Sequence, residues 1–182
     1  MATSSVADLW DVLVREAATE SSLWGETLLP VDEQRRDPVF STLCDPVFAL
    51  GVETIYEGYL LHYGRPRLFA PADEDTALLL GDYLYAHGLV RVSATGSTAA
   101  VRDLAELISL CSQARANGSD GEWAVWAATC AVLGENALDD ARKALRERGD
   151  SEPLERTARE AADGVELESA LARHRAHVGA VG

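Results

Sequence analysis

The sequence predicts an all-α protein: one domain over residues 1–182, built as a helical bundle of about six or seven helices. Three observations indicate this class. The chain has 182 residues, of which 47% are hydrophobic, and this suits a single domain with a buried core. Apolar residues recur at spacings of three and four in nearly every segment, which is typical of amphipathic helices. No segment alternates between apolar and polar residues as a β-strand does.

The first predicted helix extends from Ser5 to Glu20, with Ser4 or Ser5 as its N-cap. Residues 24–46 contain three of the six prolines and a cluster of charges, so we expect an irregular connection with short helical turns at most. The apolar residues of the first helix share one face: Val6, Leu9, Trp10, Leu13, Val14 and Ala17.

Two long helices are predicted next. The first covers residues 45–63 and ends at the Gly-Arg-Pro sequence of residues 64–66. Its apolar residues cover more than one stripe, so we expect it at the centre of the bundle. The second covers residues 76–94 and follows the acidic residues 73–75, which suit a helix N-terminus. Its long apolar run predicts the most buried helix of the protein.

The remaining helices are separated by turns rich in Gly, Asn and Ser. We expect three of them at about residues 98–117, 123–133 and 137–148. Residues 151–182 form a peripheral C-terminal helix and tail. His174 and His177, three residues apart in that segment, are expected to be exposed surface histidines rather than a metal-binding pair.

Composition and charge exclude several classes of function. Sixteen basic and thirty acidic residues give a net charge of −14, which disfavours nucleic acids and anionic lipid surfaces as partners. The cysteines are odd in number and widely spaced, which disfavours a disulfide framework or a zinc site. No stretch approaches the roughly 20 apolar residues of a transmembrane segment, and we find no signal-peptide pattern. Because all basic residues except Lys143 are Arg and Ala is abundant, we expect a bacterial protein, and the missing membrane and signal patterns lead us to expect it in the cytoplasm.

One region resembles the trans-polyprenyl diphosphate synthases. Residues 64–67, Gly-Arg-Pro-Arg, and residues 77–86, Ala-Leu-Leu-Leu-Gly-Asp-Tyr-Leu-Tyr-Ala, are similar to a G-x-P-T element followed by a helix reading L-L-x-G-D-[YF]-L in that family. Residues 52–62 and 101–108 are similar to the helices on either side. The resemblance covers about Gly51 to Arg115 and implies an isoprenoid-synthase-like helical fold.

The metal-binding motifs of that family are missing or degraded. The family uses D-D-x-x-D carboxylates to bind the magnesium ions that bridge an allylic diphosphate. The first such motif would follow His62, where Tyr63 and Gly64 stand instead. In residues 139–143, Asp-Asp-Ala-Arg-Lys, a lysine occupies the place of the third acid, so we interpret the two aspartates as first-turn helix residues. Residues 35–38 only loosely resemble the family's substrate-binding element. We therefore assign no metal ligands and no catalytic residues.

Two groups of side chains are candidates for a site. The first lines a prenyl-chain cavity between two helices in one interpretation and packs as ordinary core in the other. The second is a polar network in which Asp82, a carboxylate in an apolar helix, needs a partner. The cavity candidates are Ile55, Tyr56, Tyr59, Leu79 and Tyr83, and the network candidates are His62, Arg65, Arg67 and Asp82.

The resemblance and the missing motifs together predict a catalytically degenerate protein. By resemblance to two-component prenyl synthases, we expect an accessory or regulatory subunit that binds a full-length polyprenyl synthase, or a second copy of itself, through its helices. Three alternatives remain. The first is an isoprenoid-binding helical protein without chemistry, and the second is an active enzyme that uses magnesium through unusual ligands. The third is a helical scaffold whose resemblance to the synthases is accidental. We expect no cofactor unless the second alternative applies.

Overall fold

The computed structural model describes residues 6–118 and 121–179, and within these ranges it confirms an all-α, single-domain helical bundle. The only β-type pairing among the described residues is an isolated antiparallel bridge between Leu28 and Phe69. None of the helices in these ranges combines the length and the hydropathy that crossing a bilayer requires.

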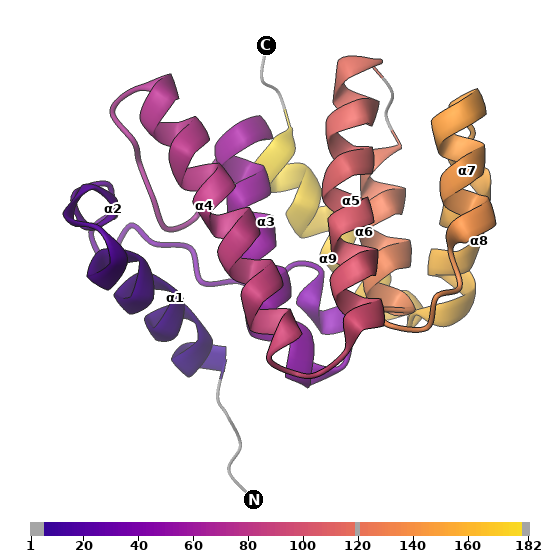
Figure 1. Cartoon of the computed structure of the whole chain (residues 1–182), viewed down its shortest axis with the longest axis horizontal. Helices are drawn as coiled ribbons and strands as arrows, with labels where there is room; N and C mark the ends of the chain where they lie inside the picture. Colours follow the sequence, from indigo (N-terminus) through magenta and orange to yellow (C-terminus); the bar gives the residue numbers. More distant parts are fainter. Residues whose placement is uncertain (1–5, 119–120, 180–182) are drawn as a thin grey trace, which may run out of the picture.

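Nine α-helices and two 3₁₀ turns make up the described chain. In Figure 1, α1 and α2 lie at one end of the molecule, α7 and α8 at the other, and α4 lies in front of α3. The elements are α1 (Val6–Glu20), α2 (Ser22–Glu26), η1 (Ser41–Leu43), η2 (Pro46–Phe48), α3 (Ala49–Tyr63), α4 (Glu74–Ser93), α5 (Thr98–Ala116), α6 (Glu122–Ala131), α7 (Asp139–Arg148), α8 (Glu152–Ala161) and α9 (Gly164–Val178).

The helix count differs from the prediction at two places. The connection over residues 24–46 is irregular as expected, but the short helix α2 ends inside it. Residues 151–182 contain two helices, because Asp163 accepts hydrogen bonds from Val165 N and Glu166 N and so starts α9 anew. The predicted peripheral position of this segment is wrong, since Leu154 of α8 and Leu171 of α9 belong to the main core.

The central position predicted for the second long helix is confirmed. Every residue of α3 from 51 to 61 is buried, so this helix has neighbours on all sides. The prediction that α4 is the most buried helix is wrong: Leu78, Leu79 and Val90 are 42%, 59% and 62% exposed. Only one face of α4 packs against the rest of the bundle. The apolar residues on its other face remain in solvent.

Two pairs of glycines bring α3 and α4 close together. A Cβ atom at Gly51 would lie 3.1 Å from the carbonyl oxygen of Gly88, and one at Gly58 would lie 2.9 Å from that of Gly81. The two glycines are seven residues apart on each helix, and their pairing shows that the helices are antiparallel. Because glycine has no Cβ, the backbones can approach at two points one heptad apart.

A second, smaller cluster covers the outer side of this helix pair. Trp10, Leu13 and Ala17 of α1 are buried at the predicted helical spacing. They pack in one cluster with buried residues from α3, α4 and the connection between these helices: Leu61, Leu68, Phe69, Leu80 and Leu84. Helix α1 therefore covers the connection that follows α3, and this connection holds the fully buried Arg67.

Replacing Gly88 with Ala tests the close approach of α3 and α4. The new Cβ would lie 2.4 Å from Ile55 Cγ1 and 2.9 Å from the Gly51 carbonyl oxygen, so the helices must separate. We expect urea unfolding to show a loss of about 1–3 kcal/mol. Gly164→Ala is the matched control, because a Cβ at this position would have nothing within 4 Å and the substitution should be neutral or stabilising. Equal stability of the two variants would contradict the close approach.

Candidate functional site

The residues predicted to line a cavity do not lie on one surface. Ile55, Tyr56 and Tyr59 are fully buried in the main core. Leu79, by contrast, is 59% exposed, so its assignment to a cavity is wrong. Tyr83 is half-buried in the smaller cluster and stacks on Trp24 at 5.9 Å between ring centroids. A prenyl chain between α3 and α4 would have to separate the backbones that the glycine pairs bring together.

The predicted polar network divides into separate parts. His62 Nε2 lies 3.2 Å from Asp82 Oδ1, so this pair forms. The Asp82 side chain is nevertheless 74% exposed and is not a buried carboxylate. Burial lowers the pKa of His62, while the nearby Asp82 partly offsets this effect. The Arg65 residue is exposed, and Arg67 lies in a different cluster, away from Asp82.

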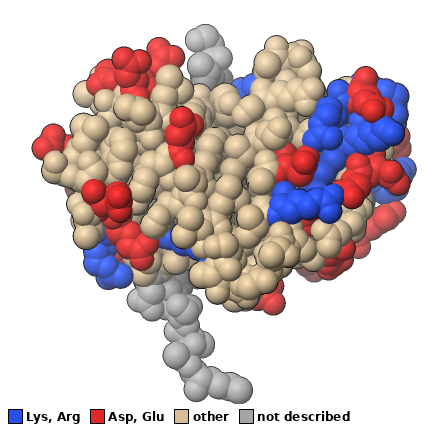
Figure 2. Space-filling view, viewed as in Figure 1, with Lys and Arg blue, Asp and Glu red and all other residues tan. Residues whose placement is uncertain are grey.

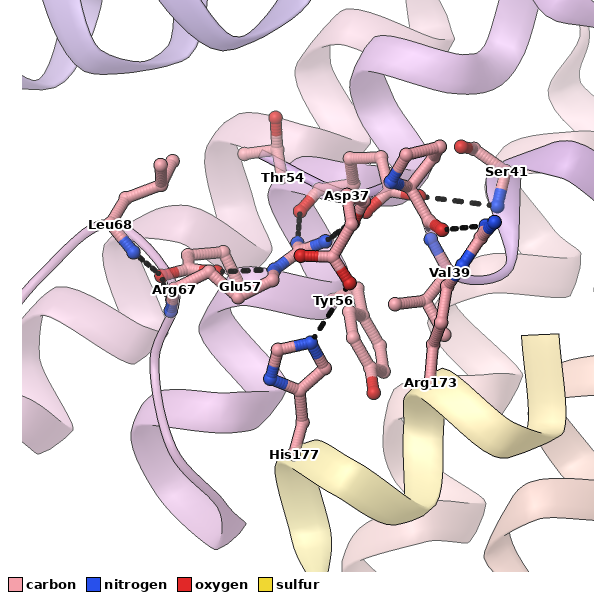
Figure 3. Close-up of polar contacts among 12 residues, drawn as sticks. Asp37, Val39, Ser41, Thr54, Tyr56, Glu57, Arg67, Leu68, Arg173 and His177 are labelled. Atoms are coloured by element: carbon pink, nitrogen blue, oxygen red, sulfur yellow. Dashed lines mark hydrogen bonds and ion pairs between the residues drawn. The ribbon is translucent and has the colours of Figure 1, made fainter. Parts of the chain in front are cut away.

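Arg67 is fully buried between two glutamates of α3 (Figure 3). Its Nε donates to Glu57 Oε2 at 2.9 Å, and its Nη1 donates to Glu53 Oε2 at 2.7 Å. Nη1 also donates to the Asp37 carbonyl oxygen. Burial alone would lower the pKa of Arg67, but the two carboxylates raise it above its usual value. The guanidinium also lies between two rings, 4.7 Å from the centroid of Trp10 and 4.9 Å from that of Tyr56.

The two glutamates bind backbone as well as Arg67. Glu57 Oε1 accepts hydrogen bonds from the amides of Arg67 and Leu68, at 2.7 and 2.8 Å. Glu53 Oε1 accepts hydrogen bonds from the amides of Val39 and Ser41. Each carboxylate therefore fixes one irregular connection onto α3. Neither acid was among the predicted site residues, although two glutamates four residues apart in an otherwise apolar helix indicate a shared buried partner.

Helix α9 reaches the same region through its histidines. His177 and His174 are 3% and 4% exposed, so the prediction that they lie on the surface is wrong. His177 Nε2 lies 3.3 Å from Asp37 Oδ2, and this contact lowers the pKa of Asp37 against the raising effect of burial. His174 Nδ1 lies 2.9 Å from the Tyr56 hydroxyl. Burial, followed by the nearby charge of Arg115, lowers the pKa of His174 to about 3.

Two other buried carboxylates are also paired with arginine. Asp103 Oδ1 of α5 accepts a hydrogen bond from Arg142 of α7 at 2.8 Å, and both side chains are 2% exposed. Glu122 Oε1 lies 2.6 Å from Arg115 Nε. Among the described residues there is no group of three or more His, Cys, Asp and Glu side chains arranged to bind a metal ion. The buried carboxylates named in this section therefore form ion pairs with arginine side chains.

The acidic clusters considered for metal binding lie at helix starts. Asp73 is the N-cap of α4 and accepts a hydrogen bond from Thr76 N at 2.8 Å. Asp139 and Asp140 occupy the first turn of α7. Both interpretations as helix-terminal residues are therefore confirmed. Asp139 in addition pairs with Arg102 of α5, so it connects two helices on the surface.

The outer face of α4 is the largest departure from the predicted pattern. Its exposed residues include an apolar stripe with spacings of four, three and four: Leu79, Tyr83, Ala86 and Val90, of which Tyr83 is half-buried. Figure 2 shows that the middle of this side of the molecule, over α4 and α5, carries few charges, whereas acidic and basic side chains crowd together at the α7 end. We call these four residues the α4 stripe. Exposed apolar residues gathered on one helix are typical of interaction surfaces.

Replacing Arg67 with Met tests the buried cluster. The substitution keeps most of the volume but leaves Glu53 and Glu57 without their cation, so we expect urea unfolding to show a loss of about 3–5 kcal/mol. The neighbouring exposed residue supplies the control, because Arg65→Met should change stability by less than about 0.5 kcal/mol. An Arg67→Met variant as stable as the Arg65→Met variant would contradict the pairing.

The buried His174 predicts a pH dependence of stability. Its pKa is about 3 in the folded protein, against 6.5 for an ordinary histidine, so only the unfolded chain takes up the proton between these values. Stability is therefore complete above about pH 6.5 and falls below it by up to about 1.4 kcal/mol per pH unit. Urea unfolding in this range should show that His174→Gln removes much of the slope. A His174 ring that titrates near pH 6.5 in NMR spectra of the folded protein would contradict the assignment.

No family model, curated protein or solved structure matches the chain. The resemblance to the trans-polyprenyl diphosphate synthases thus depends on the quoted motifs between Gly51 and Arg115. Membership of that family stays a prediction, and the function has to be inferred from the geometry of the described residues.

Proposed function

We propose that this protein is a catalytically degenerate relative of the polyprenyl synthases and acts as an accessory subunit of a prenyl diphosphate synthase. It binds the synthase through the α4 stripe. The observation that carries the proposal is that α4, the helix with the Gly81-Asp82-Tyr83-Leu84 sequence, buries one face against α3 and exposes Leu79 and Val90 on the other. Apolar side chains at these positions lose unfavourable contact with water when a partner covers them.

The pairing of the buried acids supports a role without metal-dependent catalysis. Glu53, Glu57, Asp103 and Glu122 each bind an arginine side chain. A divalent cation at any of these carboxylates would have to displace an arginine from a site where the carboxylate is shielded from water. Leaving that arginine unpaired costs several kcal/mol, so the present arrangement favours arginine over a metal ion.

The charges around the α4 stripe indicate the kind of surface it fits. The exposed charged residues near the stripe on α4 are acidic: Glu74, Asp75 and Asp82. Arg91 of the same helix is instead paired with Glu16 of α1. A partner with an apolar groove and a basic rim complements this surface. A second copy would place acidic residues opposite acidic residues, so a different chain is the better partner than a homodimer.

Co-purification tests the proposal. A tagged protein expressed in its native organism should recover a synthase that carries both aspartate-rich motifs. The double variant Leu79→Glu, Val90→Glu should lose it, because two carboxylates would be buried unpaired in the contact. Val165→Glu is the control, since Val165 is 79% exposed at the start of α9, on a different helix.

Stability and oligomeric state complete this test. The two glutamate substitutions lie on an exposed face, so circular dichroism and urea unfolding should be unchanged within about 0.5 kcal/mol. Sedimentation of the purified protein should show a monomer. Recovery of unrelated proteins, retention of the synthase by the double variant, or a stable homodimer that the double variant abolishes would each contradict the proposal.

A further inference from the structure

A pocket of about 370 Å³ opens where the C-terminal end of α5, the start of α6 and the C-terminal half of α9 meet. Its volume lies in the range of small-molecule sites. Arg115, Glu122 and Trp123 line it from α5 and α6, and Leu171, His174 and Arg175 line it from α9. None of these residues belongs to the α4 stripe, so the pocket is a separate feature of the molecule.

The one carboxylate in the pocket lining already has its partners. Glu122 is 7% exposed. Its Oε2 accepts a hydrogen bond from the Tyr59 hydroxyl, and its Oε1 lies 2.6 Å from Arg115 Nε. Arg115 Nη2 also donates to the Tyr59 oxygen at 3.1 Å. Glu122 is thus held by its neighbours and offers little as an acceptor for a ligand.

His174 presents a donor rather than an acceptor. Tyr56 is fully buried, and among the described residues its hydroxyl has His174 Nδ1 as its hydrogen-bond partner. A buried hydroxyl proton needs an acceptor, so Tyr56 donates to Nδ1. The low pKa keeps the ring neutral at neutral pH, and its single proton therefore resides on Nε2. The ring nitrogen that does not contact Tyr56 is an N–H donor.

Arg175 adds a cation without an internal partner. It lies in the last turn of α9 and is exposed, and its side chain makes no hydrogen bond or ion pair with the described residues. Trp123 and Leu171 supply apolar surface beside it, and Arg159 lies over the Trp123 ring at 5.9 Å. The pocket thus combines an apolar wall with donors that outnumber the free acceptors. This is the reverse of the whole protein, whose net charge is −14.

We propose that this pocket binds a small organic carboxylate with an aromatic or branched aliphatic body. The carboxylate accepts hydrogen bonds from Arg175 and from the free N–H of His174, because these two groups lack acceptors among the described residues. The apolar body packs against Trp123 and Leu171. A neutral or cationic ligand of the same shape would leave the donors unpaired and would bind more weakly.

Three probes of matched shape test the ligand class on the full-length protein: phenylacetate, phenylacetamide and phenethylamine. NMR spectra that resolve the Trp123 indole and the α9 amides should shift on titration with phenylacetate, with a Kd of about 1 mM. Phenylacetamide should bind at least about tenfold more weakly, and phenethylamine should not shift these signals. Equal or tighter binding of the amine would overturn the proposal, and so would the absence of any shift with phenylacetate.

Arg175→Gln identifies the site. The substitution removes an exposed charge whose side chain makes no hydrogen bond or ion pair with the described residues, so the fold should be unchanged, and phenylacetate affinity should fall about tenfold. Arg156→Gln on α8 is the control because it removes the same charge from an exposed side chain elsewhere. An equal loss in both variants would show general charge attraction and would contradict a specific site. Unchanged affinity in Arg175→Gln would contradict the assigned role of Arg175.

Discussion

The guanidinium of Arg67 is buried between two carboxylates of α3. This cluster positions the irregular connection that precedes α3 in the sequence and the one that follows it. Glu53 and Glu57 each use one oxygen for Arg67 and the other for backbone amides of a connection. Replacing the whole cluster with apolar residues could preserve stability, because burying charges is costly. The cluster also has a geometric effect, because the two carboxylates bind the amides of Val39, Ser41 and Leu68 and so position both connections on α3.

Packing against α3 also explains why the outer face of α4 is exposed. Glycines at one-heptad spacing let α4 approach α3 closely, so the inner face of α4 packs against the backbone of α3. On the outer face Tyr83 packs on Trp24 of α2, whereas Leu79 and Val90 remain in water. Helix α4 thus takes part in both the internal packing and the proposed function, because its inner face packs on α3 and its outer face carries the α4 stripe. The inner face of α4 packs within the fold, and the outer face is the surface through which we propose that a second protein binds.

The sequence predicted the helices well where periodicity and turn residues agreed. The helix predicted over residues 45–63 is the central helix α3, although it begins only at Ala49 after the 3₁₀ turn η2, and Asp73 and Asp139 lie at helix starts as their positions implied. The predictions that used hydrophobicity alone failed for α4, because an apolar residue such as Leu79 does not reveal which side of a helix has a neighbour. Arg67 was one of three possible partners of Asp82 suggested by the family resemblance, whereas its actual partners are Glu53 and Glu57 on the preceding helix. Such pairings depend on tertiary contacts that a single sequence does not display.

Backbone hydrogen exchange tests the central claim about Arg67 most directly. The amides of Val39, Ser41 and Leu68 lie outside the α-helices, and each donates to a buried glutamate. If the cluster fixes these connections, their amides exchange only on global unfolding, at the same slow rate as the amide of Tyr56 in the middle of α3. Exchange as fast as that of the exposed Val31 amide, with α3 still protected, would show that the connections open independently and would contradict the account.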